Sequence, residues 1–170
     1  SPLPPASPSL SDYADQVTRL LDQLGLARAH IVGHSMGALV ALEFALHAPE
    51  RCLSVTALNA VYCRSEAQKM AVMARVQNLQ NNNTEAAIDT TIARWFGNPT
   101  PPYLDTTAAL CRRLLSEVNA EGYARTYGLF ASSDRAHEGR LGALTCPTLF
   151  MTGEFDPNST PDMSLAMASA

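Results

Sequence analysis

Residues 32–38 read VGHSMGA, in which Ser35 has Gly33 two positions before it and Gly37 two positions after it. The stretch lies between a short apolar run typical of a buried strand and an apolar pattern with helical spacing. In a sharp strand-to-helix turn, side chains at both flanking positions would collide, so glycine is expected at both. The stretch therefore predicts a tight turn in which the backbone of Ser35 is strained and its hydroxyl projects above a sheet edge.

This turn allows two interpretations of Ser35. As a nucleophile it would attack a carbonyl group, while the backbone N–H of Met36, at the start of the helix, faces the developing oxyanion. Alternatively, the glycines only ease the turn, which could bind a phosphate. The phosphate interpretation is weaker, because no lysine follows as in a P-loop and the sequence has no GxGxxG motif. The stretch therefore favours a nucleophilic serine.

The remainder of the chain alternates predicted strands with predicted helices. Strands are predicted at residues 29–32, 53–60 and 147–151, and helices at residues 10–24 and 36–46. The first helix begins with a capping-box-like SLSD (9–12), and the proline-rich start, SPLPPASPSL (1–10), is expected to be an extended surface loop. Strands separated by helices indicate a parallel sheet with helices on both faces. The predicted fold class is α/β, a partial doubly wound, mostly parallel sheet.

A long insertion separates the second and third predicted strands. Its four predicted helices cover residues 66–80, 84–96, 106–118 and 121–132, with breaks at NNNT (81–84) and GNPTPP (97–102). Four helices exceed what a simple crossover needs, so the insertion is expected to lie over one end of the sheet as a cap. The predicted organisation is core for residues 1–62, cap for residues 63–143, and core with the start of a further helix for residues 144–170.

Asp156 follows the third predicted strand directly, in the stretch GEFDP. Parallel strands bring their carboxyl ends to one edge of the sheet, so Asp156 is expected on the same rim as Ser35. There its carboxylate would orient a catalytic base. Glu154 and Asp162 are the other candidates for this acid.

Two further interpretations of Asp156 need no catalysis. It could cap a turn with Pro157, or the segment DPNSTPD could bind calcium. Calcium is disfavoured, because Pro161 replaces the turn glycine of a calcium loop and Met167 stands where its closing glutamate should be. The acid role is therefore favoured, with turn capping as the alternative.

The base is harder to find among the four histidines. His30 lies in the first strand, as a packed or rim residue, and His47 closes a helix far from the rim. His34 is adjacent to Ser35, and adjacent side chains in a turn point apart. His137 lies where the insertion returns to the core and is expected to be a surface residue. None of them is a convincing base.

Composition excludes several classes of function. With 170 residues, 46% of them hydrophobic and 16% charged, the chain is typical of a globular domain with a real core. A net charge of −4 without basic runs argues against nucleic-acid and membrane partners. Four widely spaced cysteines favour free thiols in a reducing, cytoplasmic compartment over disulfides or zinc; these are Cys52, Cys63, Cys111 and Cys146. No metal or cofactor is predicted, and the expected partner is a small-molecule substrate.

The stretches AHIVGHSMGALVALEFALHAPERC (29–52) and PTLFMTGEFDP (147–157) resemble the α/β-hydrolase superfamily. They are most similar to its small-molecule esterases, enol-lactonases and carbon–carbon bond hydrolases. The resemblance covers nearly the whole chain and implies an eight-stranded, mostly parallel sheet with a helical cap after the sixth strand. The three strands here correspond to the fifth, sixth and seventh. The resemblance implies Ser35 as nucleophile, the Met36 N–H as one oxyanion donor and Asp156 as the acid.

The same resemblance implies parts that are expected outside these residues. In this family the chain order is serine, acid, histidine, so the catalytic histidine is expected beyond Asp156, and the second oxyanion donor before the first strand. A serine at position 35 argues against the related dehalogenases and epoxide hydrolases, which use aspartate there. Ala38 replaces a glycine that relatives often have, and Asn59 stands where some relatives place their acid.

The predicted function is hydrolysis of a small ester, lactone or activated ketone through an acyl-enzyme. The alternative is a non-catalytic, α/β-hydrolase-like protein that binds a ligand or a partner. Four aromatic residues of the cap could line a substrate pocket, although aromatics at helical spacing are more often core: Trp95, Phe96, Tyr127 and Phe130. Without the histidine, turnover by these 170 residues alone is expected to fall on the order of 10⁶-fold. The uncovered edge at residues 29–32 predicts self-association.

Overall fold

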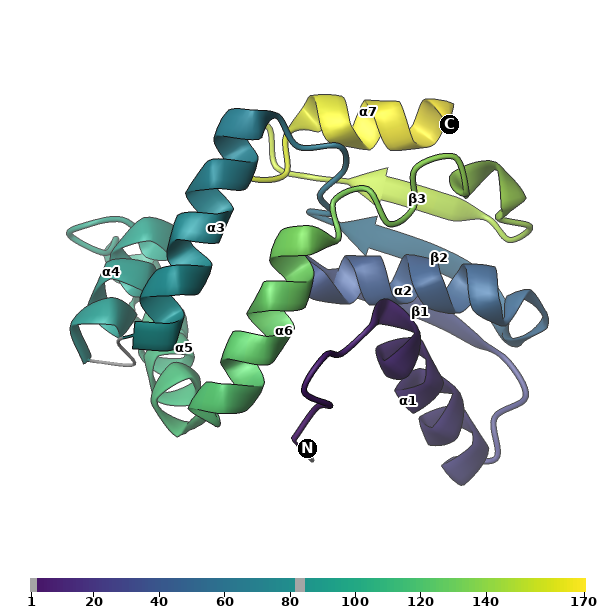
Figure 1. Ribbon diagram of the computed structural model, residues 1–170, viewed down its shortest axis with the longest axis horizontal. Coiled ribbons are helices and arrows are strands. Elements are labelled where there is room, and N and C mark those ends of the chain that lie inside the picture. The colour runs from purple at the N-terminus through teal and green to yellow at the C-terminus, as the bar shows by residue number, and fades with distance from the viewer. Residues whose placement is uncertain (1–2, 82–84) are drawn as a thin grey trace.

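The computed structural model describes residues 3–81 and 85–170 and contains one parallel sheet of three strands (Figure 1). The strands are β1 (Ala29–His34), β2 (Cys52–Leu58) and β3 (Thr148–Met151), in the order β1-β2-β3. Both pairings are parallel, so the three carboxyl ends lie at one edge of the sheet. The α/β class and the three predicted strands are confirmed, with β1 ending two residues later and β2 ending two residues earlier than predicted.

The two faces of this sheet have different surroundings. Val55 and Ala57 of the central strand are buried on one face, where they belong to the main hydrophobic core. On the other face the alternate side chains are open, with exposed fractions of 66% for Val32, 50% for Leu149 and 52% for Met151. In the described part of the chain, helices cover the first face, and the second helical layer of a doubly wound sheet is not seen.

Three helices are associated with the covered face, namely α1 (Leu10–Gln23), α2 (Met36–His47) and α7 (Pro161–Ser169). The predicted capping box at the start of α1 is confirmed. The Ser9 hydroxyl accepts a hydrogen bond from the backbone N–H of Asp12 (3.2 Å), and the Asp12 carboxylate accepts one from the backbone N–H of Ser9 (2.8 Å). These bonds satisfy donors that the first turn would otherwise leave unpaired.

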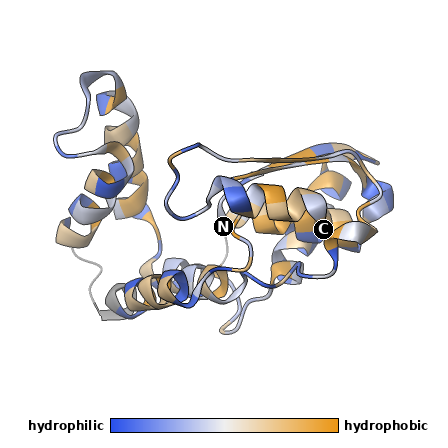
Figure 2. Ribbon diagram, turned by 90° about the horizontal axis from the view of Figure 1, so that it is seen from above, coloured by the Kyte–Doolittle hydropathy of each residue, from blue (hydrophilic) through white to orange (hydrophobic). Residues whose placement is uncertain are grey.

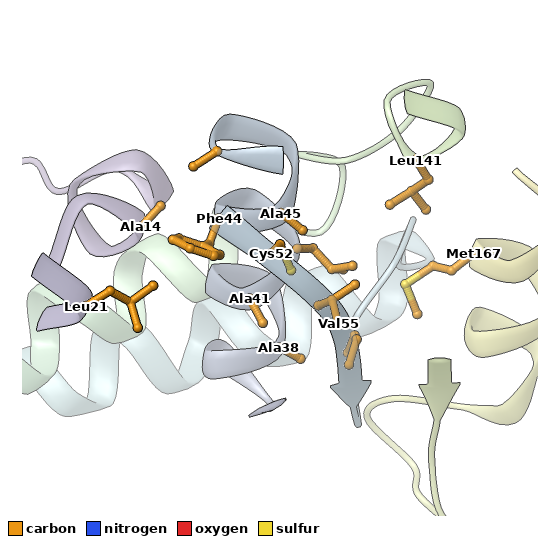
Figure 3. Close-up of a cluster of buried hydrophobic side chains, with 14 residues drawn as sticks. Ala14, Leu21, Ala38, Ala41, Phe44, Ala45, Cys52, Val55, Leu141 and Met167 are labelled. Carbon is orange, nitrogen blue, oxygen red and sulfur yellow. The ribbon is translucent and has the colours of Figure 1, made fainter. Parts of the chain in front are cut away.

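Helix α2 is the centre of the core because it is apolar on almost every side. Figure 3 shows it between α1 and β2, with Phe44 directed toward Ala14 and Leu21 of α1. Small residues on α2, such as Ala41 and Ala45, allow close approach to the neighbouring elements. A helix with this pattern is stable only when buried. Each large side chain buried here stabilises the fold by about 2 kcal/mol.

The insertion between β2 and β3 forms the four predicted helices, which are α3 (Glu66–Asn81), α4 (Glu85–Phe96), α5 (Asp105–Glu117) and α6 (Ala120–Ser132). α3 packs against α6, which lies beside α2, and α4 packs against α5 at the end of the molecule away from the sheet (Figures 1 and 2). Three short 3₁₀ turns complete the described structure, at Pro49–Arg51, Pro102–Leu104 and Leu141–Ala143. Thr84, the predicted first residue of the second of these helices, lies outside the described residues, as do the last three residues of the NNNT break.

The two ends of the insertion meet beside the core. The backbone N–H groups of Cys63 and Arg64 donate to the carbonyl oxygen (2.8 Å) and the carboxylate (2.9 Å) of Asp134. The buried Arg64 guanidinium lies 4.5 Å from the centre of the Phe130 ring and donates to the carbonyl oxygens of Phe130 and Ala131. The insertion therefore starts and ends at one well-bonded place.

The hydropathy of the residues differs between the sheet with its packed helices and the helices of the insertion. Figure 2 shows the strongest hydrophobic colour in the sheet and its packed helices, and a mixed pattern in the helices of the insertion. Across residues 3–81 and 85–170, no helix combines the length and apolar character needed to span a membrane.

Candidate active site

Ser35 lies between β1 and α2 in a strained conformation. Its φ of 56° and ψ of −118° are in a region that residues with a Cβ rarely adopt. Its backbone N–H donates to the carbonyl oxygen of Leu58 at the end of β2 (2.9 Å), which fixes the turn against the sheet. The hydroxyl makes no capping bond to α2, although Ser35 occupies the N-cap position. The Ser35 side chain is therefore held at the carboxyl edge of the sheet and does not cap α2.

The two glycines around Ser35 have different roles. A Cβ at Gly33 would lie 2.0 Å from the carbonyl oxygen of Gly37 and 2.7 Å from the backbone nitrogen of Ala38. Gly33 is therefore required by the close approach of β1 and the first turn of α2. A Cβ at Gly37 would meet no atom within 4 Å, so the steric prediction is wrong at that position. The reason is that the crowding is one-sided, because the Gly37 backbone packs on Gly33 while its own Cα faces open space.

Met36 is the first residue of α2. Its backbone N–H belongs to the first turn, whose N–H groups have no partner inside the helix. The positive end of the helix dipole lies at the same place. The sequence-predicted oxyanion donor is thus available beside Ser35.

Asp156 follows β3, with its carboxylate held by three donors. Oδ1 accepts hydrogen bonds from the backbone N–H groups of Asn158 (2.8 Å) and Ser159 (2.9 Å). Oδ2 accepts one from the side-chain amide of Asn59 (2.6 Å). The turn-capping interpretation of Asp156 is therefore realised, and the bond to Asn59 is an additional contact that turn capping does not require. The other two candidates for the acid, Glu154 and Asp162, are exposed.

Asn59 was not recognised as a functional residue from the sequence. It follows β2 directly and has a φ of 52°, a left-handed conformation that asparagine tolerates better than most residues. Its side-chain amide donates to Thr152 Oγ1 (3.1 Å) as well as to Asp156. The available signal was its position, since a polar residue directly after a parallel strand lies on the same rim as the residues after the other strands.

Ser35 and Asp156 follow β1 and β3, with β2 between them. Neighbouring strands lie about 4.8 Å apart, so the ends of β1 and β3 are about 10 Å apart. A serine–imidazole–carboxylate relay contains two hydrogen bonds of about 2.8 Å and the width of one ring, roughly 8 Å in total. The spacing of the strand ends is therefore similar to the span of such a relay, and both residues follow strands whose carboxyl ends lie at the same edge of the sheet.

His137 corrects a sequence expectation, because it is buried rather than on the surface, with an exposed fraction of 2%. Its Nε2 lies 3.1 Å from Oε2 of Glu43 on α2, and the Arg140 guanidinium donates to both oxygens of the same carboxylate. The hydrogen bond with His137, together with those from Arg140, lowers the pKa of Glu43 to about 2, although burial alone would raise it. His137 thus belongs to a hydrogen-bonded cluster with Glu43 and Arg140 that holds the end of the insertion on α2.

The other three histidines also make no hydrogen bond to Ser35 in the described part of the chain. His30 Nδ1 lies 2.7 Å from the Ser54 hydroxyl on the open face of the sheet. His47 lies 3.8 Å from Asp15, and His34 is exposed at the end of β1. Of these pairs, His30–Ser54 is a serine–histidine hydrogen bond that a labelling experiment has to distinguish from Ser35.

The predicted pocket aromatics separate into two groups. Phe130 of α6 packs into the hydrophobic cluster that contains Met36, and Tyr127 lies 5.8 Å from Phe130, measured between ring centroids. Trp95 and Phe96 are at the end of α4, in the part of the insertion away from the sheet, and Trp95 is half exposed. The structure therefore brings α6, and not the end of α4, to the neighbourhood of the serine turn.

All four cysteines are free thiols. Burial, reinforced by a contact with Cys146 at 3.7 Å between sulfurs, raises the pKa of Cys52 to about 12, so this thiol is unreactive. Within the described ranges, no group of three or more histidine, cysteine, aspartate or glutamate residues is arranged to hold a metal ion.

Comparison with known proteins agrees with this geometry. The family model described as the alpha/beta hydrolase fold matches residues 1–170. Among curated proteins, (E)-2-((N-methylformamido)methylene)succinate hydrolase of Acinetobacter baylyi is 32% identical over 164 residues, covering 96% of this chain and 60% of that protein. The 3-oxoadipate enol-lactonase 1 of the same organism is 28% identical over 156 residues, covering 89% of this chain and 56% of that protein.

Solved structures show the same arrangement. A hydrolase from Pseudomonas aeruginosa superposes with a TM-score of 0.80 and 25% identity, over 98% of this chain and 62% of that chain. The enol-lactonase from Burkholderia xenovorans has a TM-score of 0.80 at 24% identity, over 95% of this chain and 60% of that chain. The chain spans about three fifths of the length of these relatives.

Proposed function

Because this chain belongs to the α/β-hydrolase fold family, we propose that it carries the nucleophile and the acid of a serine hydrolase. The observation that carries the proposal is the conformation of Ser35, which is strained, fixed to the sheet and free of any capping role. Strain of this kind costs about 1–3 kcal/mol and persists where the surrounding structure and function require it. The proposed substrates are small esters, lactones or activated ketones.

In the proposed reaction, the Ser35 hydroxyl attacks the substrate carbonyl as a base removes its proton. The carbonyl oxygen becomes an oxyanion that the Met36 N–H stabilises at the positive end of α2. The leaving group takes the proton from the base, and an acyl-enzyme on Ser35 forms. Water, activated by the same base, then releases the acid product and restores the serine.

The base of this proposal is an imidazole between Ser35 and Asp156, with Asp156 Oδ2 accepting its N–H bond. None of the four histidines makes a hydrogen bond to Ser35 or Asp156 in the described structure, so we assign this imidazole to the protein outside these 170 residues. The second oxyanion donor is assigned there too. In this proposal, turnover is a property of the protein that contains this chain. The proposed compartment is the cytoplasm, and the helical insertion is the proposed cap over the active site.

The names of the relatives support a narrower proposed substrate class. The enol-lactonases and the succinate hydrolase found by comparison are named for small molecules in which a carbonyl carbon is bonded to an enol oxygen or an amide nitrogen. An attack by Ser35 on such a carbonyl expels a stabilised leaving group. This favours small activated carbonyl substrates over large or polymeric ones.

An active-site phosphonate probe tests the proposal in the protein that contains this chain. We expect a covalent adduct on Ser35, located by peptide mass spectrometry, and its complete loss in Ser35→Ala. Ser54→Ala is the matched control, because Ser54 has its own hydrogen bond to a histidine, and it is expected to label as the unmodified protein does. An unlabelled Ser35 would overturn the proposal in favour of a binding protein. An adduct on Ser54 would overturn the assignment of Ser35 and identify Ser54 as the nucleophile.

A further inference from the structure

Asn59 occupies the middle of the rim on which the proposed function depends. It directly follows β2, which lies between the strand that precedes Ser35 and the strand that precedes Asp156. Its backbone N–H donates to the carbonyl oxygen of Met151 (2.8 Å), and its own carbonyl oxygen accepts a bond from the Ser159 hydroxyl (2.8 Å). The side chain therefore projects from a backbone that is fixed on both sides to the segment carrying Asp156.

The neighbouring hydrogen bonds determine which way the Asn59 amide faces. The Thr152 hydroxyl has one proton, and it donates this proton to the carbonyl oxygen of Ser159 (2.6 Å). The Thr152 oxygen can then only accept, and it lies 3.1 Å from Asn59 Nδ2. The nitrogen side of the amide is thus directed toward Thr152, and its second hydrogen is donated to Asp156.

This arrangement leaves the Asp156 carboxylate with one open acceptor position. A carboxylate has about four such positions, two on each oxygen. Two backbone N–H groups, from Asn158 and Ser159, bind Oδ1, and the Asn59 amide binds Oδ2. The remaining position is on Oδ2, the oxygen that Asn59 holds.

We propose that Asn59 is a positioning residue for the hydrolysis. It fixes the plane of the Asp156 carboxylate and leaves a single acceptor position for the N–H of the catalytic imidazole. Thr152 supports this role by holding the amide in its donating orientation. The inference rests on the proposed function, and in it Asn59 touches neither the substrate nor the reacting atoms.

Other charged groups near this network are few. Arg75 of α3 donates to the side-chain oxygen of Asn158 (3.3 Å), so it contacts the loop and not the carboxylate. Glu154 and Asp162 are exposed on the segment that carries Asp156. A pH effect that appears only on changing Asn59 is therefore assigned to the Asn59–Asp156 contact.

The test measures the rate of phosphonate labelling of Ser35 against pH in the protein that contains this chain. Asn59→Asp keeps the shape but replaces the donor with a carboxylate 2.6 Å from Oδ2, and two carboxylates at this distance do not both ionise. We expect labelling to slow by about 10- to 100-fold, the effect of losing a hydrogen bond to a charged group. We also expect the acid limb of the profile to move to higher pH by about one unit.

Thr152 provides a second, milder pair of variants. Thr152→Val removes the acceptor that orients the amide and is expected to slow labelling about tenfold. Thr152→Ser keeps the hydroxyl and is expected to label like the unmodified protein. This pair keeps the test decisive even where Asn59→Asp fails to fold.

The outcomes separate the positioning role from the alternatives. A purely structural role of Asn59 would lower the melting temperature and the labelled fraction without moving the acid limb of the pH profile. It would also give Thr152→Val and Thr152→Ser the same labelling rate. This result would overturn the inference. If the unmodified protein itself is not labelled on Ser35 at any pH, the proposed function fails, and the positioning role fails with it.

Discussion

Replacing Gly33 with alanine tests the geometry that exposes Ser35. The added Cβ would lie 2.0 Å from the Gly37 carbonyl oxygen and 2.3 Å from the Gly37 carbonyl carbon, where an ordinary contact is 3.4–4 Å. These atoms are backbone atoms, so no side-chain rotation relieves the overlap. The start of α2 has to move by more than an ångström, or the turn has to open.

The magnitude follows from this overlap. Overpacking a core costs about 1–3 kcal/mol when side chains are able to adjust, and a backbone clash is at or above the upper end of that range. We therefore expect Gly33→Ala to lower the free energy of unfolding by about 3 kcal/mol or more. The matched control is Gly37→Ala, whose Cβ meets open space and which gains helix propensity worth about 0.5–1 kcal/mol.

Urea unfolding followed by far-UV circular dichroism measures both variants. With a slope of about 2 kcal/mol per molar urea, the two midpoints are expected to differ by roughly 2 M. The order should be Gly33→Ala, unmodified protein, Gly37→Ala, from least to most stable. Two results would refute the reasoning, namely a Gly33→Ala variant within about 0.5 kcal/mol of the unmodified protein, or equal destabilisation by both substitutions.

Two further predictions concern the core and the open sheet. Glu43→Gln is expected to lower the free energy of unfolding by about 2–3 kcal/mol at pH 6, because the folded state holds the pKa of Glu43 at about 2 against 4.5 for the free group. This contribution is complete above pH 4.5 and is lost as the pH falls toward 2, so urea unfolding of the two proteins should converge near pH 2, and a difference that is equal at both pH values would contradict it. Separately, the 170-residue chain is expected to self-associate, since β1 and β3 are both edge strands and Val32, Leu149 and Met151 are exposed. Sedimentation velocity should show oligomers that Val32→Lys reduces, and a monodisperse monomer would speak against this.

The parts of the structure that the sequence predicts best depend on local rules. The capping box at Ser9 joins residues three positions apart, and the strands are short, largely apolar runs. The turn at Ser35 follows from the spacing of its glycines, although the structure shows that only Gly33 is needed for steric reasons. Element types therefore came from periodicity and turn chemistry, which act within a few residues.

The contacts that sequence reasoning missed join residues far apart in the chain. His137 and Glu43 are 94 positions apart, and Asn59 and Asp156 are 97 positions apart. Pairing them requires the strand register and the path of the insertion, neither of which has a local signature. A histidine in a loop is expected to be exposed unless the helix that covers it is known. An asparagine after a strand suggests no particular role unless its hydrogen-bond partner is known.

The meeting of the two ends of the insertion has a consequence for how such proteins diversify. The backbone N–H of Cys63 lies 2.8 Å from the carbonyl oxygen of Asp134. For the sheet, the intervening helices are therefore equivalent to a short loop between two neighbouring points. The entropy of closing a loop grows slowly with its length, so this segment can lengthen, shorten or be exchanged with little effect on the strands. The strands, and the residues that follow them at the carboxyl edge, then keep their positions whatever the length of this segment.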